Sequence, residues 1–250
     1  MSNILAINPG HNASAALVVD GELVFYAEEE RYSRMKRDGN PFRAMLHVLH
    51  NWRVDEFVIG GTLTDHPRMQ WTNEDPYSAL VRKFNPQVRI TDLSGQHHLS
   101  HAAAAFYASG FDTALAVVVD GTGNLLSTVY DQERNLAIQG YETESVFLCS
   151  YPAQFELVYK RLCSQAPNST NIRTYTDGTV FYDDSVTITK AYEAVSEYLG
   201  FGFIEAGKTM GLAPYGERDE HIPPLFVDRW GNKNLLIPMY PAGALIDEAR

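Results

Sequence analysis

The sequence predicts an α/β protein built from two lobes of similar pattern. Residues 4–27 read as three short strands, with a tight turn at 8–12 after the first strand and an Asp20-Gly21 hairpin after the second. Residues 114–141 repeat the order strand, turn, strand and strand, although sequence identity between the two stretches is negligible. A repeated β-meander followed by helices indicates an internally duplicated α/β architecture with a ligand cleft between its lobes.

The composition is typical of a globular protein. The 250 residues are 45% hydrophobic and 20% charged, with a net charge of −11. This acidic balance argues against a broad basic surface that grips nucleic acid. The chain has no run of about 18 apolar residues and no signal-peptide pattern, so we expect no membrane span. Its two cysteines, Cys149 and Cys163, fit a reducing cytoplasm.

Helices and further strands are expected to complete the first lobe. Residues 41–52 predict an amphipathic helix, whose apolar side is formed by Phe42, Met45, Leu46 and Leu49. After it we expect a buried strand at 56–60, a polar loop at 62–76, a short helix at 77–84 and a strand at 87–90. The first lobe is expected to cover residues 1–110 and to end with a histidine-bearing helix.

Two histidines stand at the head of that last helix. His97 and His101 are four residues apart, so both imidazoles project from one face. Residues 114–120 read as a buried strand that ends in Asp120, and strand ends are where ligands gather in α/β sheets. Two imidazoles and a carboxylate suit Fe(II), and also Zn or Mn. The plain alternative is a helix cap, a surface histidine and a turn. His98 points away from this face, where it supports the site, contacts a ligand or is exposed.

Two further segments of the first lobe carry candidate ligand-binding residues. The turn after the first strand exposes backbone N–H groups that can cradle an anion, with His11 at its tip. Residues 28–37 are dense in charge, and Arg31 and Lys36 are placed to face phosphate or carboxylate at the same mouth. The plain alternatives are a β-turn with a solvent-facing histidine and a solvated charged loop.

The second lobe is expected over residues 111–250. After its three strands we expect a helix at 151–164, with Phe155, Val158, Tyr159 and Leu162 inside, then an irregular loop at 165–186 and a helix at 189–199 that ends at Gly200. The final segment, 245–250, resembles the start of a helix that is cut short.

A literal P-loop pattern, G-x-x-x-x-G-K-T, spans residues 202–209. Its context argues against a P-loop, because no long buried strand precedes Gly202 and Pro214 breaks any long helix after it. Lys208 stays a candidate for contact with an anion, the alternative being an exposed lysine in a turn.

Five motifs, in order over nearly the whole chain, resemble those of the O-carbamoyltransferases of nodulation factors, cephalosporins and tobramycin. They are G-H-N-A-S-A-A-L-V-V-D-G-E-L-V at 10–24, A-E-E-E-R-Y-S-R-M-K-R at 27–37, H-H-L-S-H-A-A-A-A-F-Y-A-S-G-F at 97–111, V-V-D-G-T-G at 118–123 and G-K-T-M-G-L-A-P-Y-G at 207–216. This region of the family is similar to the universal tRNA threonylcarbamoyl-transfer protein and to the hydrogenase-maturation carbamoyltransferase. The resemblance implies a duplicated actin/sugar-kinase/Hsp70-like (ASKHA) fold.

The resemblance also implies roles for individual residues. His97, His101 and Asp120 correspond to the ligands of an active-site iron, Fe(II) or another divalent transition metal. His11 corresponds to a histidine that orients the bound carbamoyl intermediate, and Lys36 to a lysine that contacts it. Both are therefore expected to be catalytic.

Four more residues are expected to bind the cofactor, namely Arg31, Gly121, Gly123 and Lys208. The chain departs from the family at one position. The family commonly has His-Asp after the first strand, whereas this chain has Asn12 after its histidine. The carboxylate is therefore absent there, and the residue that removes the proton from the acceptor hydroxyl is left open.

The implied reaction is carbamoyl transfer from carbamoyl-adenylate, made from carbamoyl phosphate and ATP, to a hydroxyl of a small-molecule acceptor. A C-terminal domain makes the adenylate in the family, and a further aspartate ligand lies downstream. We therefore expect an N-terminal piece or half of a split enzyme, weak or inactive alone, that needs this activation domain in cis or in trans. A cytoplasmic location and a possible homodimer are further expectations. The alternatives are a non-catalytic metal- or nucleotide-binding actin-like module and a sugar-kinase-type phosphotransferase.

Overall fold

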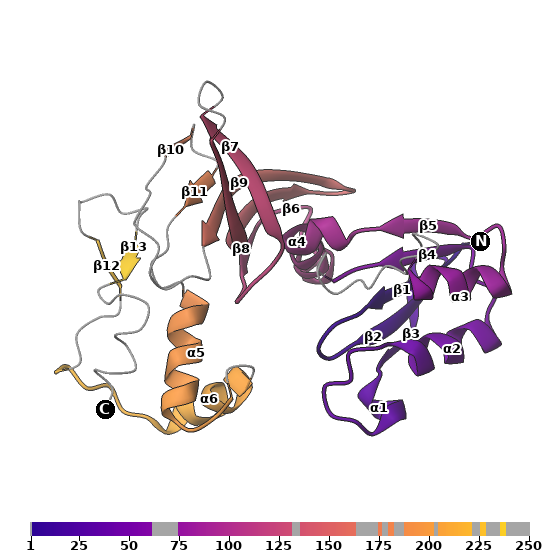
Figure 1. Cartoon of the computed structure of the whole chain (residues 1–250), viewed down its shortest axis with the longest axis horizontal. Helices are drawn as coiled ribbons and strands as arrows, with labels where there is room; N and C mark the ends of the chain where they lie inside the picture. The colour runs from indigo at the N-terminus through magenta and orange to yellow at the C-terminus, as the bar shows by residue number, and fades with distance from the viewer. Residues whose placement is uncertain are drawn as a thin grey trace. The chain divides into compact units, whose positions relative to one another are not determined.

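A computed structural model describes residues 2–61, 75–131, 136–163, 175–176, 180–182, 188–202, 205–221, 226–228 and 236–238. Within these residues the chain is a mixed α/β protein (Figure 1). It divides into two compact units, Met1–Ala104 and Ala105–Arg250. The division falls inside helix α4 (His97–Ser109), so this helix contributes residues to both units. The predicted lobes, 1–110 and 111–250, stay a prediction.

The first unit contains a five-stranded sheet. Its strands are β1 (Asn3–Asn8), β2 (Ser14–Val19), β3 (Glu22–Glu28), β4 (Glu56–Ile59) and β5 (Arg89–Asp92), in the order β3-β2-β1-β4-β5. Strand β2 is antiparallel to β1 and β3, whereas β4 and β5 run parallel to β1. The predicted opening of three strands is confirmed. Strand β5 begins two residues later than predicted.

The hairpin between β2 and β3 has the geometry that its sequence predicts. Asp20 and Gly21 have φ angles of 50° and 89°. Two consecutive positive φ angles are typical of the type I′ turn, whose twist matches that of the strands it joins. The turn therefore sets the register of β2 against β3.

Two helices, α2 (Phe42–Asn51) and α3 (Pro76–Phe84), pack on one side of this sheet (Figure 1). The core is made of apolar side chains from both helices and from β1, β2 and β4, among them Leu5, Ile7, Leu17, Met45, Val48, Phe57, Ile59, Tyr77 and Val81. Each such buried side chain contributes about 1.5–3 kcal/mol. The predicted helix at 41–52 is confirmed, although Val48, not Leu46, completes its buried face.

A charged residue fixes the start of α2. The segment 28–37 contains a short helix, α1 (Glu30–Ser33), and the Glu29 side chain just before it is buried. Its carboxylate accepts hydrogen bonds from the backbone N–H groups of Arg43 (3.1 Å) and Ala44 (2.9 Å). The segment is therefore not a fully solvated loop, because Glu29 provides acceptors for the first N–H groups of α2.

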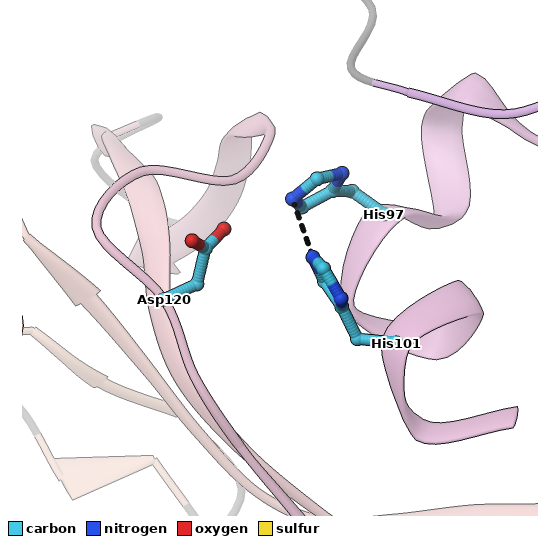
Figure 2. Close-up of side chains that lie close together, drawn as sticks. All are labelled: His97, His101 and Asp120. Carbon is cyan, nitrogen blue, oxygen red and sulfur yellow. Dashed lines mark hydrogen bonds between the residues drawn. The ribbon is translucent and has the colours of Figure 1, made fainter. Parts of the chain in front are cut away.

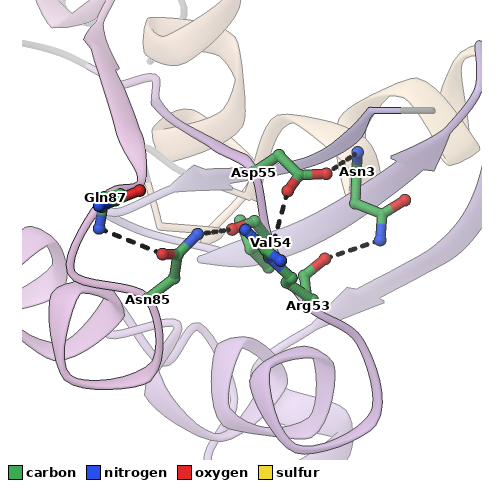
Figure 3. A network of polar contacts seen from close by, with 6 residues as sticks. All are labelled: Asn3, Arg53, Val54, Asp55, Asn85 and Gln87. Atoms are coloured by element: carbon green, nitrogen blue, oxygen red, sulfur yellow. Dashed lines mark hydrogen bonds and ion pairs between the residues drawn. The ribbon is translucent and has the colours of Figure 1, made fainter.

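A network of polar contacts joins the loops before β4 and after α3 to the start of β1 (Figure 3). The Asn3 N–H donates to the Asp55 carboxylate at 3.1 Å, and the Asn3 side chain donates to the Arg53 carbonyl at 2.7 Å. The Asn85 side chain donates to the Val54 carbonyl at 2.9 Å. These bonds satisfy backbone groups at the ends of neighbouring elements and so help to align β1 with β4.

The second unit is organised around a long strand, β8 (Leu136–Ser150). One edge of β8 pairs first with β7 (Leu125–Asp131) and then with β6 (Thr113–Val119), and both are antiparallel to it. Strands β9 (Gln154–Cys163), β11 (Val180–Tyr182) and β10 (Tyr175–Thr176) extend the other side. In the described residues β6 and β7 follow one another along β8 and do not pair with each other. The predicted repeat of the opening meander is wrong in this respect.

The prediction of a helix at 151–164 is also wrong. Strand β9 pairs antiparallel with β8 from Gln154↔Ser150 to Cys163↔Tyr141. The residues carry two periods at once, since Phe155, Leu157 and Tyr159 alternate as in a strand, while Phe155 and Tyr159 also fit a helix. The long partner strand satisfies every second backbone group of β9, and this tertiary pairing outweighs the helical spacing.

Two helices, α5 (Ile188–Tyr198) and α6 (Ala206–Leu212), follow the sheet of the second unit. Helix α5 is followed by Gly200, whose φ of 82° allows the predicted stop. Helix α6 continues into a short 3-10 helix, Ala213–Tyr215. Gly202 therefore follows a helix and not a strand, which agrees with rejecting the P-loop. Two short strands, β12 (Phe226–Asp228) and β13 (Leu236–Pro238), pair antiparallel.

Three sequence predictions concern segments with little or no description. The loop at 62–76 lies outside the described residues except at its end, and so does most of the loop at 165–186. The predicted helix start at 245–250 lies outside them entirely. Among the helices that are described, none is both long and apolar enough to cross a membrane.

Candidate metal centre

Helix α4 carries the two histidines that the sequence singled out. A 3-10 turn, Ser94–Gln96, follows β5 and leads directly into the helix. The spacing of four residues places both rings on one face, with their Nε2 atoms 3.2 Å apart and their rings almost perpendicular. The two Nε2 atoms therefore lie next to each other on the same side of the helix.

The other nitrogen of His97 is held by the backbone. Its Nδ1 lies 3.3 Å from the carbonyl oxygen of Gly61, just beyond the end of β4. An Nδ1–H that donates to this carbonyl leaves the Nε2 lone pair for a cation, which is the usual arrangement for a histidine ligand. Gly61 has a φ of 89°, and a Cβ there would lie 3.2 Å from the Pro9 carbonyl oxygen. Glycine is therefore the residue that this position requires.

Asp120 follows β6 immediately, at the start of a turn. Its carboxylate accepts a hydrogen bond from the Gly121 N–H at 2.7 Å. Its backbone N–H donates to the Thr143 carbonyl at 2.8 Å, and its own carbonyl accepts from the Thr189 hydroxyl at 2.8 Å. The backbone of Asp120 is thus fixed on both sides, and this limits the directions its carboxylate can take.

His97, His101 and Asp120 form the candidate site (Figure 2). Each offers one ligand atom, and these atoms all lie within 4.8 Å of one another. Two imidazoles and one carboxylate with further positions open is a donor set suited to Fe(II) and acceptable to Zn or Mn. The residues therefore fit a divalent transition metal. His98, the neighbouring histidine, is buried, so the possibility that it is exposed is wrong.

The turn after the Asp120 strand rests on buried charges of β8 and β9. The Glu142 carbonyl accepts from the Gly123 N–H at 2.8 Å, and the Glu142 carboxylate accepts from the Asn124 N–H at 3.2 Å. The same carboxylate pairs with Lys160, and both side chains are buried. The sequence analysis missed Glu142, Lys160 and Thr189. The two charged residues carried only a weak signal, since β8 has the acidic pair Glu142 and Glu144 and β9 has the basic pair Lys160 and Arg161.

Backbone N–H groups in and next to the predicted anion-binding turn around His11 form hydrogen bonds within the chain. The Gly10 N–H donates to the Gly39 carbonyl at 3.0 Å, and the Ala13 N–H donates to the Asp38 carbonyl at 2.9 Å. These bonds join the turn to the segment that follows Lys36. The side chains of His11 and Lys36 are both exposed, so the structure leaves them accessible, but the Gly10 N–H, one of the groups expected to cradle an anion, is already used.

The four predicted cofactor-binding residues have contacts within the chain. Arg31 is exposed and forms ion pairs with Glu28 (3.8 Å) and Glu30 (3.6 Å). Lys208, on α6, pairs with Glu205 at 2.8 Å. Such exposed pairs contribute only about 0–1 kcal/mol and yield readily to a ligand. Gly121 and Gly123 donate their N–H groups to Asp120 and Glu142, as described above. Their role in binding a cofactor stays a prediction.

Comparisons with known proteins add a family and several relatives. Residues 77–233 match the family model described as carbamoyltransferase N-terminus. The chain is similar to nodulation protein NolNO of Sinorhizobium fredii, with 27% identity over 234 residues that cover 84% of this chain and 28% of the relative. It is also similar to nodulation protein NolO of Bradyrhizobium diazoefficiens, with 30% identity over 125 residues, 50% of this chain and 16% of the relative.

Among solved structures, the chain is similar to YeaZ from Pseudomonas aeruginosa. The TM-score is 0.34 and the identity 15%, over 63% of this chain and 64% of that chain. A likeness at this level does not define the fold. The chain spans just over a quarter of the length of NolNO and about a sixth of the length of NolO.

Proposed function

Since this chain belongs to the carbamoyltransferase family, whose N-terminal region it matches over residues 77–233, we propose that it is the metal-binding transfer part of an O-carbamoyltransferase. The observation that carries the proposal is the group of His97, His101 and Asp120, whose ligand atoms lie within 4.8 Å of one another. Family membership supports carbamoyl transfer as the reaction, and the three ligand residues support a metal ion at the site where it takes place.

The cation that fits the donor set is Fe(II) or another divalent transition metal. His97 and His101 would provide neutral nitrogen ligands, and Asp120 a charged oxygen ligand. When bound, such a cation neutralises negative charge on a phosphate group of the substrate. The hydrogen bond between His97 Nδ1 and the Gly61 carbonyl supports this assignment, because it directs the Nε2 lone pair toward the cation.

The proposed reaction moves a carbamoyl group to a hydroxyl of a small-molecule acceptor. The hydroxyl oxygen forms a bond to the carbamoyl carbon of carbamoyl-adenylate, the bond from that carbon to the phosphate oxygen breaks, AMP leaves, and the hydroxyl proton passes to a base. His11 and Lys36 are proposed to hold the adenylate for this attack. Asn12 cannot serve as the base, since its amide has no basic group at neutral pH.

The adenylate itself is proposed to come from carbamoyl phosphate and ATP in a C-terminal domain, joined to this chain or supplied in trans. Arg31, Gly121, Gly123 and Lys208 are proposed to contact the nucleotide end of the intermediate. Association into a homodimer and a cytoplasmic location complete the proposal, the latter supported by the two isolated cysteines.

We further propose that the first unit is the first lobe of an ASKHA fold. Its support is the sheet, in which an antiparallel opening of three strands is followed by β4 and β5, both parallel to β1. The second unit resembles the first in that helices follow its β-sheet along the chain. It differs because, within the described residues, β6 and β7 both pair with β8 and not with each other.

The test is metal analysis of anaerobically purified protein. We expect about one equivalent of iron or another divalent transition metal in the parent, and its loss in His101→Ala. His50→Ala is the matched control, because His50 is an exposed histidine of α2 that lies outside the candidate site. Equal metal content in all three proteins, or none in the parent, would overturn the metal site. Carbamoylated acceptor formed from carbamoyl-adenylate separates a transferase from a non-catalytic module.

A further inference from the structure

Helix α5 directs two side chains at the Asp120 turn. Thr189 and Glu193 are four residues apart and therefore lie on one face of the helix. The Thr189 hydroxyl donates to the Asp120 carbonyl at 2.8 Å. The Glu193 Oε1 atom lies 3.0 Å from the place that a Cβ on Gly121 would occupy. One face of α5 thus contacts Asp120 and lies beside Gly121 at the start of the turn.

The rotation of α5 that produces these contacts is fixed from its far end. The Ser196 hydroxyl is fully buried and lies 2.6 Å from the Thr209 hydroxyl of α6. Glu193 is partly buried, whereas Glu197, one turn further along the same helix, is exposed. Glu193 is therefore held toward the Asp120 turn by the packing of the helix, and Glu197 is not.

We propose that Glu193 is a positioning residue of the cation site, acting on a divalent cation from outside the group of direct ligands. This inference rests on the proposed function. The direct group consists of His97, His101 and Asp120, and Glu193 is not part of it. Its carboxylate lies instead over Gly121, the residue whose N–H donates to the Asp120 carboxylate.

A carboxylate in this position strengthens cation binding in two ways. Its negative charge adds to that of Asp120, so the attraction for a divalent cation increases. Its oxygens can also accept a hydrogen bond from a water bound to the cation, and such outer contacts commonly change metal affinity by about 10- to 100-fold. Thr189 complements this effect, because it fixes the Asp120 backbone from the same helix.

The experiment is a titration of the parent chain and its variants with Co(II) alone, followed by the visible absorption of the bound ion. Glu193→Gln removes the charge with little change in shape, and we expect Co(II) to bind about tenfold more weakly. Glu197→Gln is the matched control, since it removes the same charge from the same helix. Its affinity is expected within about twofold of the parent, because an exposed charge is screened by water and salt.

Glu193→Asp keeps the charge but draws it back by one methylene, so an affinity between those of the parent and Glu193→Gln is expected. If circular dichroism shows that Glu193→Gln does not fold, Glu193→Asp replaces it as the test variant. A Co(II) affinity of Glu193→Asp equal to that of the parent would then overturn the inference. Co(II) binding that His101→Ala abolishes, but that is equal in Glu193→Gln and Glu197→Gln, overturns the inference and leaves the proposed function standing. A parent that binds no Co(II) overturns both.

Discussion

Glu142 and Lys160 form an ion pair in the interior of the second unit, on neighbouring strands β8 and β9. Their side chains are only 4% and 11% exposed. The second carboxylate oxygen of Glu142 accepts the Asn124 N–H at 3.2 Å. Both oxygens of one buried carboxylate are therefore used, and Glu142 joins β9 to the turn that begins at Asp120.

Removing one partner of this pair should destabilise the protein strongly. Lys160→Met leaves the Glu142 carboxylate buried without its cation, and we expect a loss of about 3–5 kcal/mol in the free energy of unfolding. The double variant Glu142→Gln, Lys160→Met should lose less, because it leaves no uncompensated buried charge. Urea denaturation measures both values.

The matched control is Arg53→Met, which breaks the exposed pair with Asp55. Its cost should be at most about 1 kcal/mol. Equal costs for Lys160→Met and Arg53→Met would show that the pair in the interior has no special weight.

Local patterns predicted most of the first unit. The three opening strands, the Asp20-Gly21 hairpin and helix α2 each follow from features within a dozen residues. Strand β9 shows where such patterns fail, because its residues fit both periods and only its partner β8 decides between them. The Glu29 carboxylate shows a second limit. It is a charged residue in a charged segment, and its burial depends on α2, which begins beyond that segment.

The same contrast holds for the candidate site. The spacing of His97 and His101 predicted that they share a helix face, and the end of a strand predicted the place of Asp120. The contacts that hold Asp120 come from α5 and β8, which are distant in sequence. A single sequence has no local signal for such contacts, since they depend on how whole elements pack.

The Glu56 carboxylate should titrate below its ordinary pKa. It accepts a hydrogen bond from Arg89, and this contact, with a second from the Thr91 hydroxyl at 2.9 Å, lowers the pKa of Glu56. A lowered pKa in the folded state means that the contact contributes stability above the unfolded pKa of about 4.3, and that this is lost as pH falls through the lower folded value.

Arg89→Gln should therefore move the pKa of Glu56 up toward its ordinary value, and carbon NMR of the Glu56 carboxyl group measures this shift. The melting temperatures of parent and variant should differ by a constant amount above about pH 5 and converge as pH falls through the lowered pKa that Glu56 has in the folded parent. Thr91→Val should shift the pKa less, because the Arg89 hydrogen bond has the larger effect. Identical titration of Glu56 in parent and Arg89→Gln would contradict this account.

The last prediction concerns the glycine beside Asp120. Gly121→Ala places a methyl group 3.0 Å from the Glu193 carboxylate, so that carboxylate must shift by a few tenths of an ångström. If Glu193 acts on the cation from its present position, the substitution should weaken Co(II) binding severalfold, by less than the roughly tenfold expected for Glu193→Gln. Because a side-chain end moves more easily than backbone, the free energy of unfolding should change by less than about 1 kcal/mol.

A double-mutant cycle separates this contact from a general disturbance of the turn. In a Glu193→Gln background, Gly121→Ala should have little further effect on Co(II) affinity, because the charge it displaces is already gone. Gly207→Ala is the control, since a Cβ at Gly207 meets no atom within 4 Å. It lies in α6, where alanine favours the helix over glycine by up to about 1 kcal/mol, so stability should rise while Co(II) affinity stays constant. Equal losses of affinity from Gly121→Ala in both backgrounds would place its effect on the Asp120 backbone and not on Glu193.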